Sequence, residues 1–529
     1  CILKKYRSGL TIILSCLMLT GCASNSDISS ISKISDYSSN DNTSSYETDD
    51  TLDDEVEYYY SDDTPIYSFE KRYEKIKEQY PDKSVLVWLT DSYVRYETEL
   101  NQYLVDNDYD YVICFKTLDM SSDYGDTYIT EIKNMSEEEV KFDILDSFSV
   151  VLGSDVVSNS YYYLAENDLY APLDTYLTSD KYADIYTAFP QKYWGSYQYG
   201  GHIYGVDNSF STLCADSGLL IYDDVLTQSG LSAEEFLKPL DKLAPAFEQI
   251  SKACDKPFAF SCEFWTNDIF PANYPTSVGI ALSGGKAVNV FEQDEMLDHY
   301  KLLKKYADKN YITVDSPAEI IAGYNIERRA AYGKTVSNDI SAYTEVFNKQ
   351  NNYICSPTNA VGVYSGSENK DLAADALLNI LYNKDINNVI TYGVEGVQYD
   401  VQDGKAVMKF DENGNHFRID AKYNNPDISY SGADEYEVIV PTEHYAAYEN
   451  AEYLDGCGFL FDGTDIKDKY INVVNKICEF APPYADENSD IEMYIGDFNE
   501  ALYSAGLQDI LDEVNRQLEE YNETHNTDN

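Results

Sequence analysis

The sequence contains many carboxylates but no arrangement of residues that is typical of a catalytic site. It has 93 Asp and Glu residues in 529, so carboxylate pairs at a glycosidase-like separation are expected by chance and identify no acid–base couple. The GxSxG, HExxH and Walker patterns are absent. GGK at 284–286 and GKT at 333–335 lack the earlier glycine of a phosphate-binding loop and indicate turns. We therefore expect no enzymatic activity.

The cysteines and histidines indicate neither a metal site nor a bound cofactor. Seven cysteines follow residue 22 at dispersed positions without a CxxC pair, and the five histidines include no HxxxH pair. An odd, dispersed set argues against a disulfide framework and against a zinc site. We expect these cysteines to be small buried residues, and we expect no metal and no cofactor.

Cys22 differs from the other cysteines because it follows a segment typical of a secretory signal peptide. A positively charged start precedes an apolar run from Gly9 to Thr20, which is too short to span a bilayer, and Leu-Thr-Gly-Cys follows at 19–22. This arrangement resembles a bacterial lipobox, in which the cysteine sulfur takes a diacylglyceryl group before cleavage. We expect residues 1–21 to be a lipoprotein signal peptide and Cys22 to be the acylated membrane anchor. The alternative is an ordinary secretory peptide with a chance cysteine.

Residues 22–65 form a polar segment of Ser, Asn, Asp, Thr and Glu with hardly an apolar cluster. Such a segment buries too little apolar surface to offset the entropy of ordering, so we expect a disordered tether. The remaining chain is long enough for two or more domains. The formal net charge of -55 excludes nucleic acid as an expected partner, because its phosphates would be repelled.

Apolar runs and helical spacing alternate after residue 83. SVLVWL at 84–89, DYVICFKTL at 110–118 and KFDILDSFSV at 141–150 are typical of buried strands. Tyr93, Tyr96, Leu100 and Leu104 recur at helical spacing between the first two runs. Strand, helix, strand is the pattern of a parallel α/β fold.

Later segments show helical faces and one group of hairpin turns. Apolar stripes predict helices around residues 296–307, 372–381 and 510–521, and Ser232 with Glu235 forms a possible capping box for another. Between them, Asp403-Gly404 and Asn413-Gly414 favour type I′ turns. We expect three strands in a small β-meander there.

Seven segments between Ser84 and Tyr521 follow one another in a recognisable order. They are LAENDLYAPLDTYL (164–177), FPQKYWGSYQYGGHIYGVDNS (189–209), SGLLIYDDVLTQSGL (217–231), YADKNYIT (306–313), ITYGVEGVQYDVQDGKAV (390–407), GFLFD (458–462) and LYSAGLQDILDEVNRQLEEY (502–521). In sequence and in order, these segments are similar to extracellular solute-binding proteins of ABC importers, in the family typified by maltose-binding protein. The last three segments resemble the lipoprotein branch of that family for carbohydrate uptake.

The resemblance implies an α/β, two-lobed periplasmic-binding-protein-like fold of class II, with ligand bound in an interlobe cleft. The chain crossings between the lobes would lie near Val206 to Ser209, Tyr324 and Thr358. We expect lobe 1 to comprise residues 66–207 and 325–357, and lobe 2 to comprise residues 208–324 and 358–529.

The same resemblance implies a lipid-anchored receptor at the extracellular face of a bacterial cell membrane. It would act as a monomer, capture a sugar or oligosaccharide and deliver it to an ABC permease. Two alternatives remain open: a receptor for a peptide or another small solute, and a surface glycan hydrolase or adhesin.

Candidate ligand contacts follow from the preference of sugars for aromatic faces and for carboxylate or amide groups. Ligands of open α/β sheets bind at the carboxyl ends of strands, where the first and third predicted strands place some of these residues. The others lie at the predicted crossings or in EFWTNDIF of lobe 2. The candidates are Trp88, Asp91, Asp146, Ser147, Asn208, Trp265, Asn267 and Asn338.

Overall fold

The structure is a computed structural model, and it describes most of the chain beyond residue 55. The predicted signal peptide, Cys22 and most of the predicted tether lie outside the described residues. The described ranges are 56–59, 65–90, 94–117, 141–147, 151–152, 156–157, 159–207, 213–215, 218–236, 238–254, 258–259, 279–313, 343–347, 352–354, 356–357, 360–410, 423, 428–432, 451–453, 456–480, 483–485 and 489–525.

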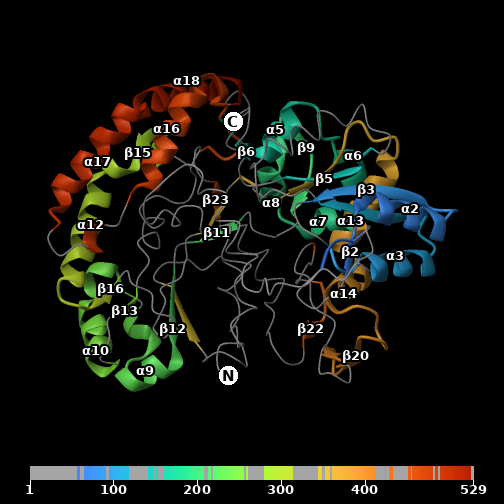
Figure 1. Cartoon of the computed structure of the whole chain (residues 1–529), viewed down its shortest axis with the longest axis horizontal. Helices are drawn as coiled ribbons and strands as arrows, with labels where there is room; N and C mark the ends of the chain where they lie inside the picture. The colour runs from blue at the N-terminus through green and yellow to red at the C-terminus, as the bar shows by residue number, and fades with distance from the viewer. Residues whose placement is uncertain are drawn as a thin grey trace, which may run out of the picture.

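Two large and separate hydrophobic clusters define two lobes. The first joins buried residues of 86–206 to buried residues of 354–451, and the second joins those of 225–312 to those of 459–518. Figure 1 shows the two lobes on opposite sides of the molecule. The predicted two-lobed α/β fold is confirmed.

Lobe 1 is built on a mixed five-stranded sheet in the order β10-β19-β5-β3-β4. β3, β4 and β5 run parallel, as the strand–helix–strand pattern predicted. β19 is antiparallel to both of its neighbours, β5 and β10. The strands are β3 (Ser84–Thr90), β4 (Tyr111–Thr117), β5 (Ile144–Asp146), β10 (Val206–Asp207) and β19 (Ala360–Val363).

Helices and short hairpins complete lobe 1, with α3 packed on β4 and α13 packed on β19. The helices are α2 (Phe69–Gln79), α3 (Glu97–Asp106), α5 (Ser160–Glu166), α6 (Asp174–Leu177), α7 (Ala183–Ala188), α8 (Gln191–Ser196), α13 (Lys370–Tyr382) and α14 (Lys384–Tyr392). The paired strands are β1 (Val56–Tyr59) with β2 (Pro65–Tyr67), β6 (Val151–Leu152) with β7 (Val156–Val157), and β8 (Gln198–Tyr199) with β9 (His202–Ile203).

A buried ion pair fixes α2 and α3 to the edge strand β4. Arg72 donates from Nη1 to Glu97 Oε2 at 2.6 Å and from Nη2 to the carbonyl of Phe115 at 2.6 Å. Glu97 Oε2 also accepts the backbone N–H of Phe115 at 2.8 Å. Burial raises the pKa of Glu97, and the charge and hydrogen bond of Arg72 oppose that rise.

Lobe 2 is mainly helical, with three short strand pairs and five 3-10 turns among its described elements. The buried positions Met296, Tyr300 and Leu303 lie on one face of α12, and Ile510, Val514 and Leu518 lie on one face of α18, as predicted. Its elements are β12 (Gly218–Tyr222), α9 (Asp223–Ser229), η4 (Ala233–Phe236), η5 (Leu240–Lys242), α10 (Ala244–Cys254), β13 (Phe258–Ala259), β14 (Ile280–Ser283), β15 (Lys286–Asn289), η6 (Val290–Glu292), α12 (Asp294–Ala307), β16 (Ile312–Thr313), β17 (Tyr343–Phe347), η8 (Thr464–Ile466), α16 (Lys467–Cys478), η9 (Pro483–Ala485), α17 (Ile491–Ala505) and α18 (Leu507–His525).

The possible capping box at Ser232 is only half formed. The backbone N–H of Ser232 donates to the Glu235 carboxylate at 3.0 Å. The segment that follows is the single 3-10 turn η4 rather than an α-helix.

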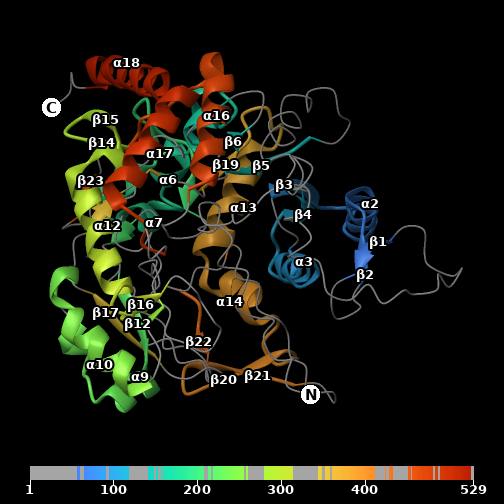
Figure 2. The same cartoon turned by 60° about the vertical axis from the view of Figure 1, so that its left-hand side comes forward.

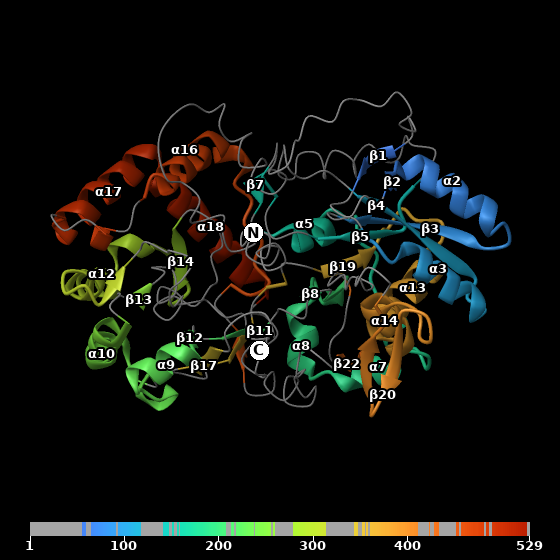
Figure 3. The ribbon, with the colours of Figure 1, turned by 60° about the horizontal axis from the view of Figure 1, so that its bottom comes forward.

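Three strands lie where the chain passes between the lobes, and they form one sheet in the order β11-β18-β23. β11 (Leu213–Ala215) follows β10 of lobe 1, β18 (Asn352–Ile354) precedes β19 of lobe 1, and β23 (Glu452–Tyr453) precedes the last helices of lobe 2. Figures 1 and 3 show β11 in the middle of the molecule. We call β11, β18 and β23 the crossing sheet.

The crossing sheet changes two of the predicted boundaries. Residues 360–392, predicted for lobe 2, lie in lobe 1, because β19 completes its sheet and α13 packs on β19. Residues 343–347, predicted for lobe 1, pair with β12, which packs on α9 of lobe 2. The predicted crossing near Thr358 falls between β18 of the crossing sheet and β19 of lobe 1. The predicted crossing near Tyr324 lies outside the described residues. None of the three predicted crossings lies near β23.

The predicted hairpin at Asp403-Gly404 is present. Asp403 and Gly404 both have positive φ, 53° and 80°, as a type I′ turn requires, and they join β20 (Tyr399–Gln402) to β21 (Lys405–Met408). The third strand of this sheet is β22 (Ser431–Gly432), which is parallel to β21, so the sheet is not the predicted meander. Asn413-Gly414 lies outside the described residues. Figure 2 shows this hairpin beyond the end of α14.

The predicted tether ends earlier than residue 65. β1 pairs with β2 in antiparallel register, with Val56 opposite Tyr67 and Tyr59 opposite Pro65. The valine and tyrosines of VEYY have high strand propensity, which here outweighs the acidic composition that predicted disorder.

The described part of the chain contains no helix long and apolar enough to cross a membrane. Among the same residues, no group of three or more His, Cys, Asp or Glu side chains is placed to hold a metal ion.

Candidate functional site

Two of the predicted contact residues meet at the carboxyl edge of the lobe 1 sheet. Because β3, β4 and β5 are parallel, their carboxyl ends share this edge, where open α/β sheets bind ligands. Trp88 pairs in register with Phe115 on one side and with Ile144 on the other. We call Trp88, Thr90, Phe115, Asp146 and Tyr423 the edge cluster.

Asp146 is the polar centre of the edge cluster. Trp88 donates from Nε1 to Asp146 Oδ1 at 2.8 Å, and the Tyr423 hydroxyl donates to Asp146 Oδ2 at 2.6 Å. The same hydroxyl is hydrogen-bonded to Thr90 Oγ1 at 2.9 Å. Each carboxylate oxygen therefore receives a donor from an aromatic side chain.

The aromatic rings of the edge cluster are packed together and buried. The ring centroid of Tyr423 lies 4.5 Å from that of Trp88 and 5.9 Å from that of Phe115, and the Tyr423 and Phe115 planes differ by 15°. Trp88 and Tyr423 are 0% exposed and Asp146 is 1% exposed. Burial raises the pKa of Tyr423 well above its ordinary value, and the Asp146 charge adds to the rise, so the phenol stays protonated.

Ser147 joins β5 to β19 rather than facing solvent. Its backbone N–H donates to the carbonyl of Ala360 at 2.6 Å, and its Oγ accepts the backbone N–H of Ala360 at 2.8 Å. Ser147 is 1% exposed. These contacts extend the strand pairing of Asp146 with Val361 by one residue.

The structure thus brings Trp88, Asp146 and Ser147 to one sheet edge and buries all three. The other predicted contacts, Asp91, Asn208, Trp265, Asn267 and Asn338, lie outside the described residues. Sequence reasoning missed Tyr423, because nothing in its polar neighbourhood AKYNNP distinguishes it from the other 50 tyrosines. Thr90 had a signal, since it ends the first predicted strand.

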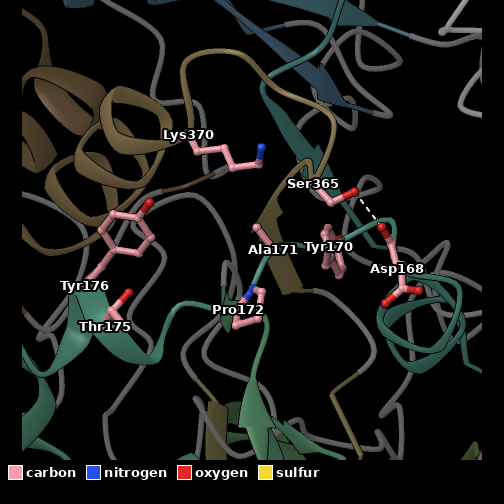
Figure 4. Close-up of a pocket in the computed structure, with 8 residues that line it drawn as sticks. All are labelled: Asp168, Tyr170, Ala171, Pro172, Thr175, Tyr176, Ser365 and Lys370. Atoms are coloured by element: carbon pink, nitrogen blue, oxygen red, sulfur yellow. Dashed lines mark hydrogen bonds between the residues drawn. The ribbon is translucent and has the colours of Figure 1, made fainter.

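A shallow pocket of about 450 Å³ lies elsewhere on lobe 1 (Figure 4). β19 runs antiparallel to β5, and its last residue, Val363, pairs with Ile144 at the start of β5. Val363 therefore lies at the end of β5 opposite to Asp146. The pocket lies just beyond Val363, and its Tyr170 forms a bridge with Tyr364. It is therefore separate from the edge cluster. It is lined by Asp168, Tyr170, Ala171, Pro172, Thr175, Tyr176, Ser365 and Lys370.

Solved structures with the same fold include those of the N-glycan transport solute binding protein (NgtS) of Streptococcus pneumoniae. One has a TM-score of 0.63 and 18% sequence identity, and the match covers 83% of this chain and 99% of that chain. Another, described as a complex with Man5GlcNAc, has a TM-score of 0.53 and 18% identity, covering 84% and 99% of the two chains.

A curated relative matches at the level of sequence. It is a carbohydrate ABC transporter substrate-binding protein of Streptococcus pneumoniae serotype 4, 25% identical over 395 residues, which are 69% of this chain and 78% of the relative. This chain is similar, in sequence and in fold, to solute-binding proteins of ABC importers. The resemblance inferred from the sequence is thereby confirmed.

One family match falls on lobe 2 of this chain. A domain of unknown function (DUF3502) matches residues 456–523. This range begins just after β23 of the crossing sheet and contains α16, α17 and most of α18. It coincides with the final return of the chain to lobe 2.

Proposed function

We propose that this chain is a lipid-anchored receptor that captures an oligosaccharide at the extracellular face of a bacterial membrane and delivers it to an ABC permease. The observation that carries the proposal is its similarity, over 83% of its length, to a solute-binding protein described as transporting N-glycans. Mannose-containing glycans are accordingly the first ligands to test.

The proposed mechanism rests on two lobes joined by the crossing sheet. A ligand that contacts both lobes favours the closed arrangement by its differential affinity for that state. The lobe 1 contacts would come from the carboxyl edge, with Trp88, Asp91, Asp146 and Ser147. Asn208, Asn338, Trp265 and Asn267 remain the proposed contacts from the crossings and lobe 2. The closed monomer is the form that the permease would recognise.

Glycan binding should raise the thermal stability of the purified protein. A ligand that binds only the folded state adds about 2.7 kcal/mol to the free energy of unfolding at 100 times its Kd. We expect thermal-shift hits with glycans such as Man5GlcNAc and intact glycan after incubation. Hits with a peptide library alone would contradict the carbohydrate assignment, and cleaved glycans would contradict the assignment as a receptor.

Trp265→Ala tests one proposed contact directly. If Trp265 stacks on a sugar ring, the variant should lose much of the glycan-induced shift and keep nearly the same melting temperature without ligand. A tryptophan in a protein core would instead cost about 3–5 kcal/mol when truncated. A lowered melting temperature with an unchanged glycan shift would remove Trp265 from the site.

Lipid anchoring should depend on Cys22. Cys22→Ser removes the sulfur that the diacylglyceryl group requires, so we expect the protein either in the medium or unprocessed. Membrane fractionation, with mass spectrometry of the mature N-terminus, measures this. Unchanged, processed protein in the membrane fraction of the variant would refute the anchor.

A further inference from the structure

Tyr423 occupies a slot that has the chemistry of a sugar subsite. Its ring lies 4.5 Å from the Trp88 ring and 5.9 Å from the Phe115 ring, measured between centroids. The slot lies at the carboxyl edge of β3 and β5, where this kind of sheet binds ligands. Aromatic faces of this kind also pack against the C–H surfaces of a pyranose ring.

The polar contacts of Tyr423 are those that a sugar hydroxyl would make. Its hydroxyl donates to Asp146 Oδ2 at 2.6 Å and is hydrogen-bonded to Thr90 Oγ1 at 2.9 Å. A carboxylate beside a hydroxyl can accept from one sugar hydroxyl and bond to it or its neighbour. The slot therefore holds a six-membered ring with a hydroxyl at its end.

The backbone of Tyr423 is in a conformation that a bulky residue seldom adopts. Its φ is +61°, in the left-handed region where only glycine, asparagine and aspartate are common. Such a conformation costs free energy and persists where surrounding contacts hold it, most often at functional sites. The contacts with Trp88 and Asp146 that hold Tyr423 are also the contacts that a ligand would replace.

We propose that the slot formed by Trp88, Thr90, Phe115 and Asp146 is a subsite for one pyranose ring, and that Tyr423 occupies it until sugar displaces the phenol. This inference rests on the proposed function. The displacement makes only a fraction of the protein competent to bind, and the apparent Kd equals the intrinsic Kd divided by that fraction. Tyr423 thereby lowers the affinity for every ligand that needs this subsite.

Tyr423→Phe tests the inference while keeping the ring. The variant loses the hydrogen bonds to Asp146 and Thr90, so the ring should hold its place less tightly and the apparent Kd for glycan should fall roughly tenfold. Calorimetric titration with Man5GlcNAc, or with the glycan that gives the largest thermal shift, measures the Kd. Without ligand, the melting temperature should fall, because a buried hydrogen-bonded phenol has been removed.

Tyr161→Phe is the matched control. Tyr161 is also fully buried in lobe 1, and its hydroxyl donates to the carbonyl of Tyr197 at 2.6 Å. We expect this variant to lose stability but to keep the wild-type Kd. A Tyr423→Phe variant that behaves like this control would show a purely structural tyrosine and overturn the inference.

Each remaining outcome of the glycan titration either supports or overturns the inference. Weaker glycan binding by Tyr423→Phe would mean that the phenol contacts the sugar, which overturns displacement and leaves the proposed function intact. If the wild-type protein binds none of the glycans, the proposed function fails and the inference falls with it. Tighter binding together with lower stability supports the inference.

Discussion

Glu97→Ala is expected to lower the free energy of unfolding of lobe 1 by about 3–5 kcal/mol, because it leaves a buried charge without its partner. The side chains of Arg72 and Glu97 are only 11% and 10% exposed. The substitution also removes the acceptor of the Phe115 N–H at the edge of the sheet. Urea unfolding followed by tryptophan fluorescence measures this, since Trp88 and Trp194 both belong to the lobe 1 cluster.

Two further variants separate the ion pair from helix effects. Thr98 is exposed on the same helix, so Thr98→Ala should change stability by no more than about 0.5 kcal/mol. Replacing Arg72 and Glu97 together by leucine should recover much of the lost stability, because no unpaired charge then remains buried at this position. A Glu97→Ala variant as stable as Thr98→Ala would show that the ion pair contributes nothing.

Trp88→Ala should also cost about 3–5 kcal/mol, because it empties a large volume in a packed core. Trp88 is 0% exposed and contacts both Phe115 and Tyr423. The substitution additionally removes the donor to Asp146 Oδ1. Thermal unfolding without ligand measures the loss, which should far exceed that of Trp265→Ala if Trp265 is a ligand contact.

Trp88→Phe separates the stability lost with the indole N–H from the stability lost with the aromatic ring. It keeps an aromatic ring but removes the indole N–H, so the loss should be about 1–3 kcal/mol, as for a buried acceptor that loses its partner. Near-wild-type stability of both Trp88 variants would mean that the indole is not part of the core.

Features set by neighbouring residues could be predicted from the sequence. The apolar run of β3, the helical stripe of α12 and the Asp403-Gly404 turn each depend on a few adjacent side chains. The position of β19 could not be predicted in this way. Its four residues AVGV are compatible with any buried strand, and their place between β10 and β5 depends on partners more than 150 residues away.

The position of the candidate site could be predicted from the sequence, but the burial of its residues could not. Strand ends indicated Trp88 and Asp146, and both lie at the predicted sheet edge. Both are buried, and both contact Tyr423, a residue 277 positions beyond Asp146 in the chain. Periodicity carries no signal for such a contact, so it was found only in the structure.

The place of β19 has a consequence for the order in which the chain can fold during its synthesis. β10 reaches the lobe 1 sheet only through β19, and some 150 residues of lobe 2 and the crossing sheet are made between them. At about 5–20 residues per second, roughly 8–30 s pass before β19 has emerged. During that interval one side of β5 lacks its strand partner and offers an open edge to other chains. A factor that keeps the growing chain unfolded would therefore raise the yield of the correctly assembled lobe.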